Sequence, residues 1–127
     1  MAAGLRRNVY KGIGEIHFIF GAGAETPTVQ SVAALALRKQ LVLHVDSPAL
    51  DIHTLFGSHS KLRILWAHAG HQKPSAVGRM LSRYPTLRVD LSLRAKDIAP
   101  GGKLDPSWRG LFERYPDRFM IGSDTSS

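Results

Sequence analysis

The chain has 127 residues and contains no cysteine. This excludes a disulfide framework, a cysteine-ligated zinc site and a thiol nucleophile. Its apolar runs all fall short of the ~18 residues that a membrane-spanning helix needs. The first eight residues, MAAGLRRN, lack the apolar core of a secretory signal, which predicts a cytoplasmic protein or an internal start at Met1.

Clustered charge is also missing, although the net charge is high. Lys and Arg number 17 against 10 acidic residues, giving +7 and a pI near 10.3. The cations are dispersed, and no helix-turn-helix, zinc-finger or aromatic RNA-binding pattern accompanies them. We therefore interpret them as solvated surface charge and expect neither a nucleic-acid nor a membrane partner. A hydrophobic fraction of 43% is typical of an ordinary globular domain.

Short apolar segments alternate with helical patterns along the whole chain. Strands are predicted over residues 12–20, 41–45, 62–68, 87–93 and 119–122, each with many β-branched or large apolar residues. Helices are predicted over 29–40 (with Thr28 or Ser31 as its cap), 48–56, 74–84 and 105–115. Strands alternating with helices of this length indicate an α/β fold with a parallel sheet and right-handed crossovers.

Residues of types that can bind metals lie on the predicted strands or at their ends. They are Glu15 and His17 on the first strand, His44 and Asp46 on the second, His68 on the third and Asp124 after the fifth. A single histidine at a strand end is usually structural, but parallel strands bring their carboxyl ends to one edge, where ligands bind. Several imidazoles and a carboxylate form a donor set for a catalytic divalent ion. The pattern suggests a metal-assisted hydrolase or lyase.

Three motifs resemble those of a known superfamily. They are Leu43-His44-Val45-Asp46, Trp66-Ala67-His68-Ala69-Gly70 and the stretch from Arg118 to Thr125, RFMIGSDT. In this order and spacing they resemble the amidohydrolase superfamily, within it the amidohydrolase-related branch of metal-dependent (β/α)8-barrel enzymes. The resemblance implies a partial TIM barrel, in which the five predicted strands correspond to strands four to eight.

The resemblance also implies roles for particular residues. His44, His68 and Asp124 would be metal ligands, with Asp124 taking a proton from the attacking water and His68 also acting in catalysis. Glu15 and His17 are further ligand candidates. The implied cofactor is a divalent metal ion, with zinc expected. From their own positions in loops after the strands, Arg94, as a cation for a substrate carboxylate, and His71 are candidates for contact with the substrate.

The chain also departs from the family. A complete barrel has about 250 residues, and the His-x-His pair of the family's first strand is missing here, as is the closing helix. We therefore expect residues 1–127 to form a single incomplete barrel domain. Its two edge strands would be open to pairing, which predicts self-association. On its own the chain should have little activity.

The expected function is hydrolysis of a small cyclic or aromatic acid, lactone or amide by metal-activated water. Two alternatives stay open at this point. One is a non-oxidative decarboxylase of the same family, and the other is a non-catalytic α/β binding module with vestigial histidines. A basic nucleic-acid-associated protein is a more distant rival.

Overall fold

The computed structural model describes residues 12–17 and 26–122, and for residues 15–17 it describes the backbone alone. These residues contain five strands: β1 (Gly12–His17), β2 (Val42–Asp46), β3 (Arg63–Trp66), β4 (Leu87–Asp90) and β5 (Phe119–Met120). The α-helices are α2 (Pro27–Lys39), α3 (Ala49–Ser58), α4 (Pro74–Arg83), α5 (Ala95–Ile98) and α6 (Pro106–Arg114). Two 3-10 segments, η1 (Ala67–His71) and η2 (Pro100–Gly102), complete the described elements.

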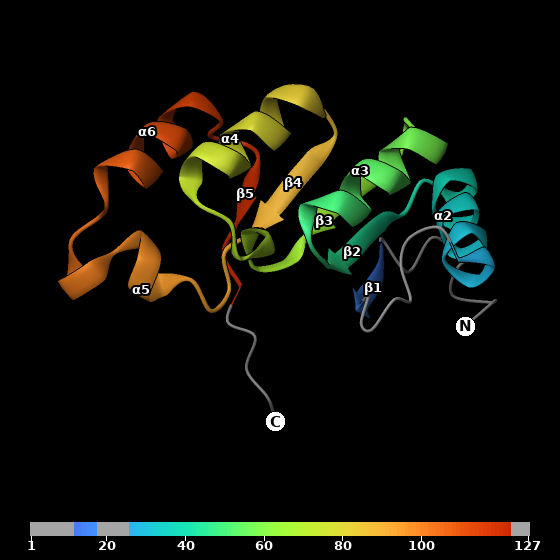
Figure 1. Cartoon of the computed structure of the whole chain (residues 1–127), viewed down its shortest axis with the longest axis horizontal. Coiled ribbons are helices and arrows are strands. Elements are labelled where there is room, and N and C mark those ends of the chain that lie inside the picture. Colours follow the sequence, from blue (N-terminus) through green and yellow to red (C-terminus); the bar gives the residue numbers. More distant parts are fainter. Residues whose placement is uncertain (1–11, 18–25, 123–127) are drawn as a thin grey trace.

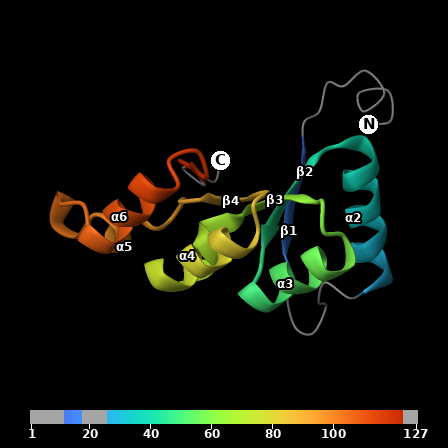
Figure 2. The same ribbon diagram turned by 90° about the horizontal axis from the view of Figure 1, so that it is seen from above.

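The strands form a single parallel sheet in the order β1-β2-β3-β4-β5 (Figure 1). Each strand pairs with its neighbour in the sequence, and each connection contains a helix. Right-handed crossovers in one direction place their helices on the same face of the sheet. In Figures 1 and 2, α3, α4 and α6 accordingly follow one another along one side. The predicted α/β fold with a parallel sheet is confirmed.

The hydrophobic core lies between the sheet and these helices. Side chains alternate between the two faces of a strand, and in β2 to β4 the positions that face the helices are almost fully buried. They are Leu43, Val45, Ile64, Trp66, Leu87 and Val89. Helix residues such as Ile52, Leu55, Val77 and Leu81 pack against them. Burial of one such side chain contributes about 1.5–3 kcal/mol.

The opposite face of the sheet is more polar. His44, Leu65 and Arg88 occupy neighbouring register positions across β2, β3 and β4. His44 and Leu65 are half-buried and Arg88 is exposed. Parallel sheets are normally covered on both faces, whereas within the described residues polar and charged side chains occupy this face.

The ends of two helices are fixed by side-chain caps. The Thr26 hydroxyl accepts from the Val29 amide at 3.4 Å, so the cap of α2 is Thr26 and the prediction of Thr28 or Ser31 is wrong. Pro27 explains the difference, because proline favours the first turn, where its missing N–H costs nothing. Asp105 caps α6 ahead of Pro106, and its carboxylate accepts from the Ser107 and Trp108 amides.

Three predicted strands are too long, and the one predicted over 119–122 ends at Met120. The segment 62–68 leaves the strand after Trp66, because the chain turns into η1, where His68 has a φ of 56°. The segment 87–93 ends as a strand at Asp90, and α5 and η2 were not expected between it and α6. Residues 18–20 of the first predicted strand lie outside the described residues.

Arg118 ties β5 to the rest of the sheet. Its Nε donates to the Leu87 carbonyl at 2.6 Å, and its Nη2 donates to the carbonyls of Leu81 and Tyr84 at the end of α4. A cation at a helix C-terminus also interacts favourably with the helix dipole. In the motif that begins at Arg118, the arginine thus has a structural role.

Candidate functional site

The structure describes some of the predicted site residues, near the C-terminal edge of the sheet, but not all of them. His44 lies in β2, His68 and His71 lie in η1, and Arg94 directly precedes α5. Glu15 and His17 are on β1, but their side chains fall outside the description, and Asp124 lies outside the described residues altogether. The roles predicted for these three residues therefore stay predictions.

Asp90 is the centre of a hydrogen-bond network at this edge. It is only 7% exposed. Its Oδ1 accepts from the Ser92 hydroxyl at 2.7 Å, the Ser92 amide at 2.9 Å and the His68 amide at 3.3 Å. Its Oδ2 accepts from His44 Nε2 at 2.8 Å. One carboxylate thus connects β2, β4 and η1.

The same contacts determine the ionisation of Asp90. Burial of the carboxyl disfavours its charge and acts to raise the pKa, but the hydrogen bonds from Ser92, His44 and the His68 amide outweigh burial. The net result is a pKa below the ordinary aspartate value. Asp90 is therefore an anion at neutral pH, where charge-assisted hydrogen bonds are the stronger kind.

Ser92 fixes the orientation of the His68 ring through contacts with its Nδ1 atom. The Nδ1 atom of His68 lies 2.9 Å from both the carbonyl oxygen and the hydroxyl oxygen of Ser92. A carbonyl only accepts, so Nδ1 carries the proton and donates, which leaves Nε2 of the neutral ring with a lone pair. Nε2 is turned toward Asp46, whose Oδ2 lies 3.7 Å away. Metal-binding histidines are typically held in this way, with the second ring N–H donated to a carbonyl or carboxylate.

Asp46, His68 and His71 form a cluster whose composition suits a metal ion. One ligand atom from each residue lies within 4.8 Å of the other two. The His68 and His71 rings have centroids 5.2 Å apart. His68 is buried, Asp46 is half-buried and His71 is exposed. The cluster is therefore open to solvent on the side of His71. Two imidazoles and a carboxylate leave an open coordination position, as in catalytic divalent sites.

The backbone that presents the two histidines is strained. His68, Ala69 and His71 have φ values of 56°, 49° and 55°, which are unfavourable for residues with a Cβ by about 1–2 kcal/mol each. Gly70, at φ 59°, lies against Trp66, since a Cβ there would fall 2.0 Å from the ring. Trp66 is buried and donates from Nε1 to the Ser47 carbonyl at 2.9 Å. Such strain is most common at functional sites.

Arg94 holds this segment in place. Its Nη1 and Nη2 donate to the carbonyls of His68 and Gln72, each at 2.8 Å, and its Nε donates to Asp97 at 2.9 Å. Its guanidinium also lies 5.3 Å from the centre of the Trp108 ring. Arg94 is 5% exposed, and the structure gives it a structural role. Its predicted contact with substrate stays a prediction.

Among the described residues, the structure brings together a cluster that overlaps only partly with the predicted ligand set. His68 belongs to both sets, His71 was expected to contact substrate, and Asp46 was not selected as a ligand. The signal for Asp46 was present in the sequence, because it lies two residues after His44 at the end of the same strand. His44 has Asp90 as its partner, and a metal-ligand role for it remains a prediction.

Asp90 and Ser92 were also missed as organising residues. Their i, i+2 spacing is compatible with a carboxylate that accepts from a nearby backbone amide and hydroxyl. The partnership with His68 and His44, however, joins residues 22 to 46 positions apart.

Neither the family models nor the curated proteins and solved structures that were searched include a match to this chain. No helix of the described residues is long and apolar enough to cross a membrane. The α/β fold and the Asp46, His68 and His71 cluster are therefore the observations from which a function has to be inferred.

Proposed function

We propose that this chain carries the metal site of a divalent-metal-dependent hydrolase, with Asp46, His68 and His71 as protein ligands and zinc as the ion. The single observation that carries the proposal is the convergence of these three ligand atoms to within 4.8 Å of one another. Support comes from the Ser92 contact, which leaves the Nε2 lone pair of His68 directed toward the Asp46 side. Two nitrogen donors and one oxygen donor suit zinc.

The proposal assigns particular tasks to the residues of the chain. A zinc ion bound here would supply a Lewis acid and a water of lowered pKa, about 7 in known zinc enzymes. Ser92 and Asp90 keep His68 in one tautomer and orientation, and Arg94 anchors the η1 backbone that carries both histidines. Such preorganisation is what a catalytic site requires from its surroundings.

The substrate and the larger architecture belong to the same proposal. The sequential order of parallel strands with helices on one face is the arrangement of a (β/α)-barrel segment, which supports the partial barrel inferred from the resemblance. The substrate class is that of the resemblance, a small cyclic or aromatic acid, lactone or amide. A decarboxylase and a non-catalytic binding module remain the alternatives.

Metal content after zinc loading and desalting tests the proposal. We expect close to one zinc per chain for the unmodified protein, and a loss of affinity of more than about 100-fold for Asp46→Asn and His71→Ala, since even indirect contacts to a metal contribute 10–100-fold. His59→Ala is the matched control, because it removes an imidazole at the C-terminal end of α3, outside the cluster. Retention by the two ligand variants would contradict the ligand set.

The same experiment separates the observed cluster from the set expected from the resemblance. His44→Gln and Asp124→Asn should retain zinc if Asp46, His68 and His71 are the ligands. If these two variants lose the metal while Asp46→Asn and His71→Ala keep it, the resemblance gives the correct ligands. If the unmodified protein binds no zinc, the metal proposal is wrong.

Hydrolysis is tested separately with a panel of aryl esters, lactones and anilides in the presence of zinc. Turnover that is lost in both His71→Ala and Asp46→Asn, but not in His59→Ala, would support a hydrolase. Zinc binding without turnover of any panel member would leave the metal site standing and argue against hydrolysis by this chain alone.

A further inference from the structure

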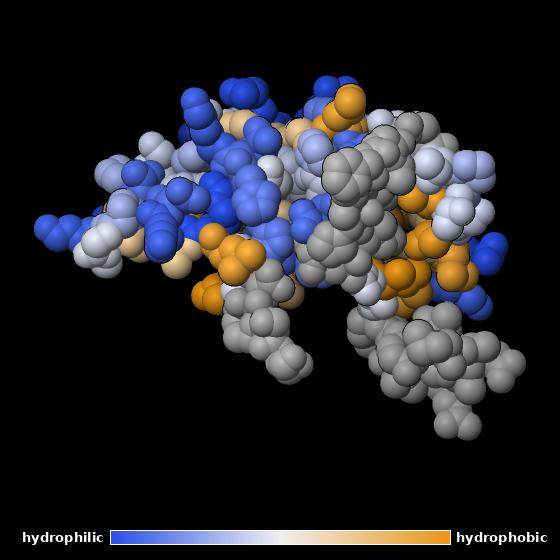
Figure 3. All heavy atoms as spheres, turned by 60° about the horizontal axis from the view of Figure 1, so that its bottom comes forward, coloured by the Kyte–Doolittle hydropathy of each residue, from blue (hydrophilic) through white to orange (hydrophobic). Residues whose placement is uncertain are grey.

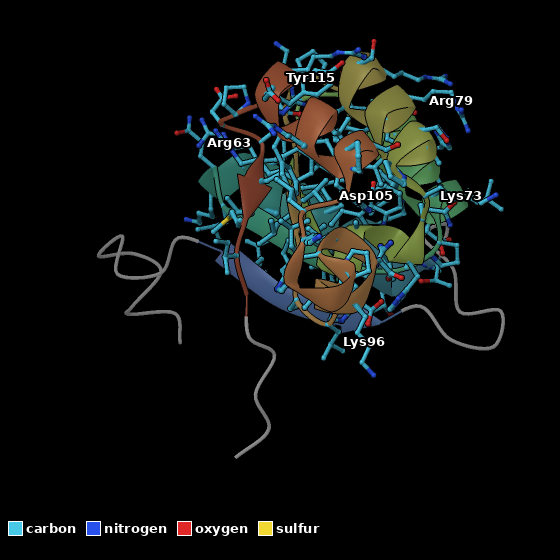
Figure 4. The ribbon with its side chains drawn as sticks, turned by 90° about the vertical axis from the view of Figure 1, so that its left-hand side faces the viewer. Arg63, Lys73, Arg79, Lys96, Asp105 and Tyr115 are labelled. Carbon is cyan, nitrogen blue, oxygen red and sulfur yellow. The ribbon has the colours of Figure 1, made fainter. Side chains whose placement is uncertain are left out.

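A second feature of the molecule is a groove between α4 and α6. It encloses about 1190 Å³ and runs past the loops that precede the two helices. In Figure 4 the viewer looks onto this side of the molecule, where α4 and α6 lie next to each other. Apart from His71, the groove is built from residues outside the metal cluster.

Small residues create the hollow. On α4, Ser75, Gly78 and Ser82 follow one another at helical spacing and face α6 across the groove. Gly78 permits a close approach, since a Cβ there would lie 3.1 Å from Leu111 of α6. Gly110 lines the groove from the other helix. The two helices therefore touch at the base and leave an open channel above.

The charge of the groove is strongly unbalanced. Its exposed cations are Lys73, Arg79, Arg83 and Arg114. Its two acids are already engaged, because Asp97 pairs with Arg94 at 2.9 Å and Asp105 caps α6. Within the described residues, none of the four cations has an ion pair, and the contact found for Arg83 is with the ring of Tyr84.

The spread of these cations indicates an elongated ligand. Lys73 precedes α4, Arg79 lies in its second half and Arg83 is its last residue. A helix of ten residues is about 15 Å long, so one phosphate or carboxylate cannot reach all three. A chain that carries several negative charges can do so.

The aromatic residues of the groove argue against single-stranded nucleic acid as the elongated, negatively charged ligand. Recognition of single strands relies on exposed rings on which bases stack. Trp108 is 2% exposed and has Arg94 against its ring, and Arg118 lies against the ring of Tyr115. An acidic polypeptide needs no stacking platform, and a channel between two helices is a common docking site for such a segment.

We propose that the groove between α4 and α6 is a docking site for an acidic polypeptide segment, bound through Lys73, Arg79, Arg83 and Arg114. The carboxylates of the segment would pair with these cations, and the Ser75, Ser82 and Ser107 hydroxyls are available as hydrogen-bond donors along the channel. The overall charge of +7 would speed the encounter with an acidic partner. This site requires no metal and is independent of the proposed hydrolase function.

The test measures binding of a fluorescein-labelled peptide of twelve glutamates by anisotropy at low salt. The triple variant Arg79→Gln, Arg83→Gln, Arg114→Gln should bind about tenfold more weakly, the effect expected from the loss of three exposed ion pairs. The control variant Arg38→Gln, Lys39→Gln, Lys61→Gln loses the same charge at exposed positions outside the groove. It should bind within about twofold of the unmodified protein if pairing is local.

The possible results are distinct. Equal weakening in both variants would show that only net charge matters and would overturn the proposal, as would no weakening in either. Inorganic pyrophosphate that displaces the peptide at stoichiometric concentration would point to a compact anion site instead. A twelve-nucleotide single-stranded DNA that binds more tightly than the peptide, through the same arginines, would likewise overturn it. Circular dichroism of both variants checks that they fold.

Discussion

Two residues of the same strand show how differently the two ends of the sheet are built. Arg88 and Asp90 lie two positions apart in β4 and therefore on one face. Arg88 is exposed, and no ion pair or hydrogen bond of its side chain occurs within the described residues. Asp90 is buried and accepts four hydrogen bonds. At the C-terminal end of β4, polar groups are organised around the buried Asp90 carboxylate. At the other end, the Arg88 side chain is exposed to solvent.

This difference matters for function because a site needs defined positions. Ser92, His44 and the His68 amide all converge on Asp90, and Arg94 bonds the backbone beside them. Buried polar networks of this kind rigidify their surroundings when every member is satisfied. In the described residues no buried side-chain nitrogen or oxygen lacks a partner. Substitution of Asp90 should therefore cost much more stability than substitution of Arg88.

The largest effect is expected for Gly70→Ala. The new Cβ would fall 2.0 Å from the buried Trp66 ring at a φ of 59°, and we expect a loss of about 4 kcal/mol in the free energy of unfolding, from overlap and strain together. Gly101→Ala is the matched control, since Gly101 has a φ of 64° but no atom within 4 Å. It should cost about 1 kcal/mol. Urea unfolding of both variants measures the difference, and equal losses would show that η1 is loosely packed.

The next effect is that of Asp90→Asn. The side chain keeps its shape but directs an NH2 group at donors, so we expect a loss of about 3 kcal/mol in the free energy of unfolding. Arg88→Gln in the same strand should change it by less than about 0.5 kcal/mol. Urea unfolding at pH 7 compares them. A small effect of Asp90→Asn would remove the basis for treating the two ends of β4 as different.

Because the pKa of Asp90 is lowered in the folded protein, the stability difference between Asp90→Asn and the unmodified protein should depend on pH. A carboxyl whose pKa is lower in the folded state binds fewer protons there than in the unfolded chain, so its contribution is complete above the ordinary aspartate pKa. This stabilising contribution of Asp90 is lost as the pH falls through its lowered pKa in the folded state. The gap in stability between Asp90→Asn and the unmodified protein should therefore narrow in strong acid, and a gap that is constant with pH would contradict it.

A smaller loss is expected for Arg94→Lys. Lysine keeps the charge but cannot reach the carbonyls of His68 and Gln72 and the Asp97 carboxylate together. We expect a loss of about 2 kcal/mol in the free energy of unfolding, together with weaker zinc retention. Arg109→Lys is the control, because Arg109 forms an exposed pair with Glu113 that contributes little. Similar stability for the two variants would argue against Arg94 as the anchor of η1.

The smallest expected effect concerns His53 in α3, remote from the sheet edge. Burial and the nearby Arg83 charge lower its pKa, and it contacts the Tyr84 hydroxyl. The unfolded chain therefore binds a proton at His53 more readily than the folded chain, so stability falls as the pH drops below about 6.5. His53→Gln should make the decline in the free energy of unfolding between pH 7 and 5 slightly shallower than in the unmodified protein. Identical slopes for His53→Gln and the unmodified protein would contradict the lowered pKa of His53.

The sequence predicts much of the fold but less of the site. Periodicity identifies the strands and helices because burial on one face imposes it, as for Val77, Met80 and Leu81 of α4. It does not reveal that the chain turns left-handed at His68, since a φ of 56° at a histidine depends on the contacts of Gly70 with Trp66 and of Arg94 with the His68 carbonyl. The Arg94 contact joins residues 26 positions apart, and the approach of Asp46 to His68 and His71 is likewise non-local.

The sequential order of the strands has a further consequence, for the way the chain folds. Every pairing, from β1 with β2 to β4 with β5, joins segments that follow one another in the sequence. Each step then closes only the single segment that connects two consecutive strands, and the entropy of loop closure grows only slowly with length. Such a topology can assemble by adding one strand–helix unit at a time, as repeat proteins do. The growing sheet would present a parallel edge for the next unit at every stage.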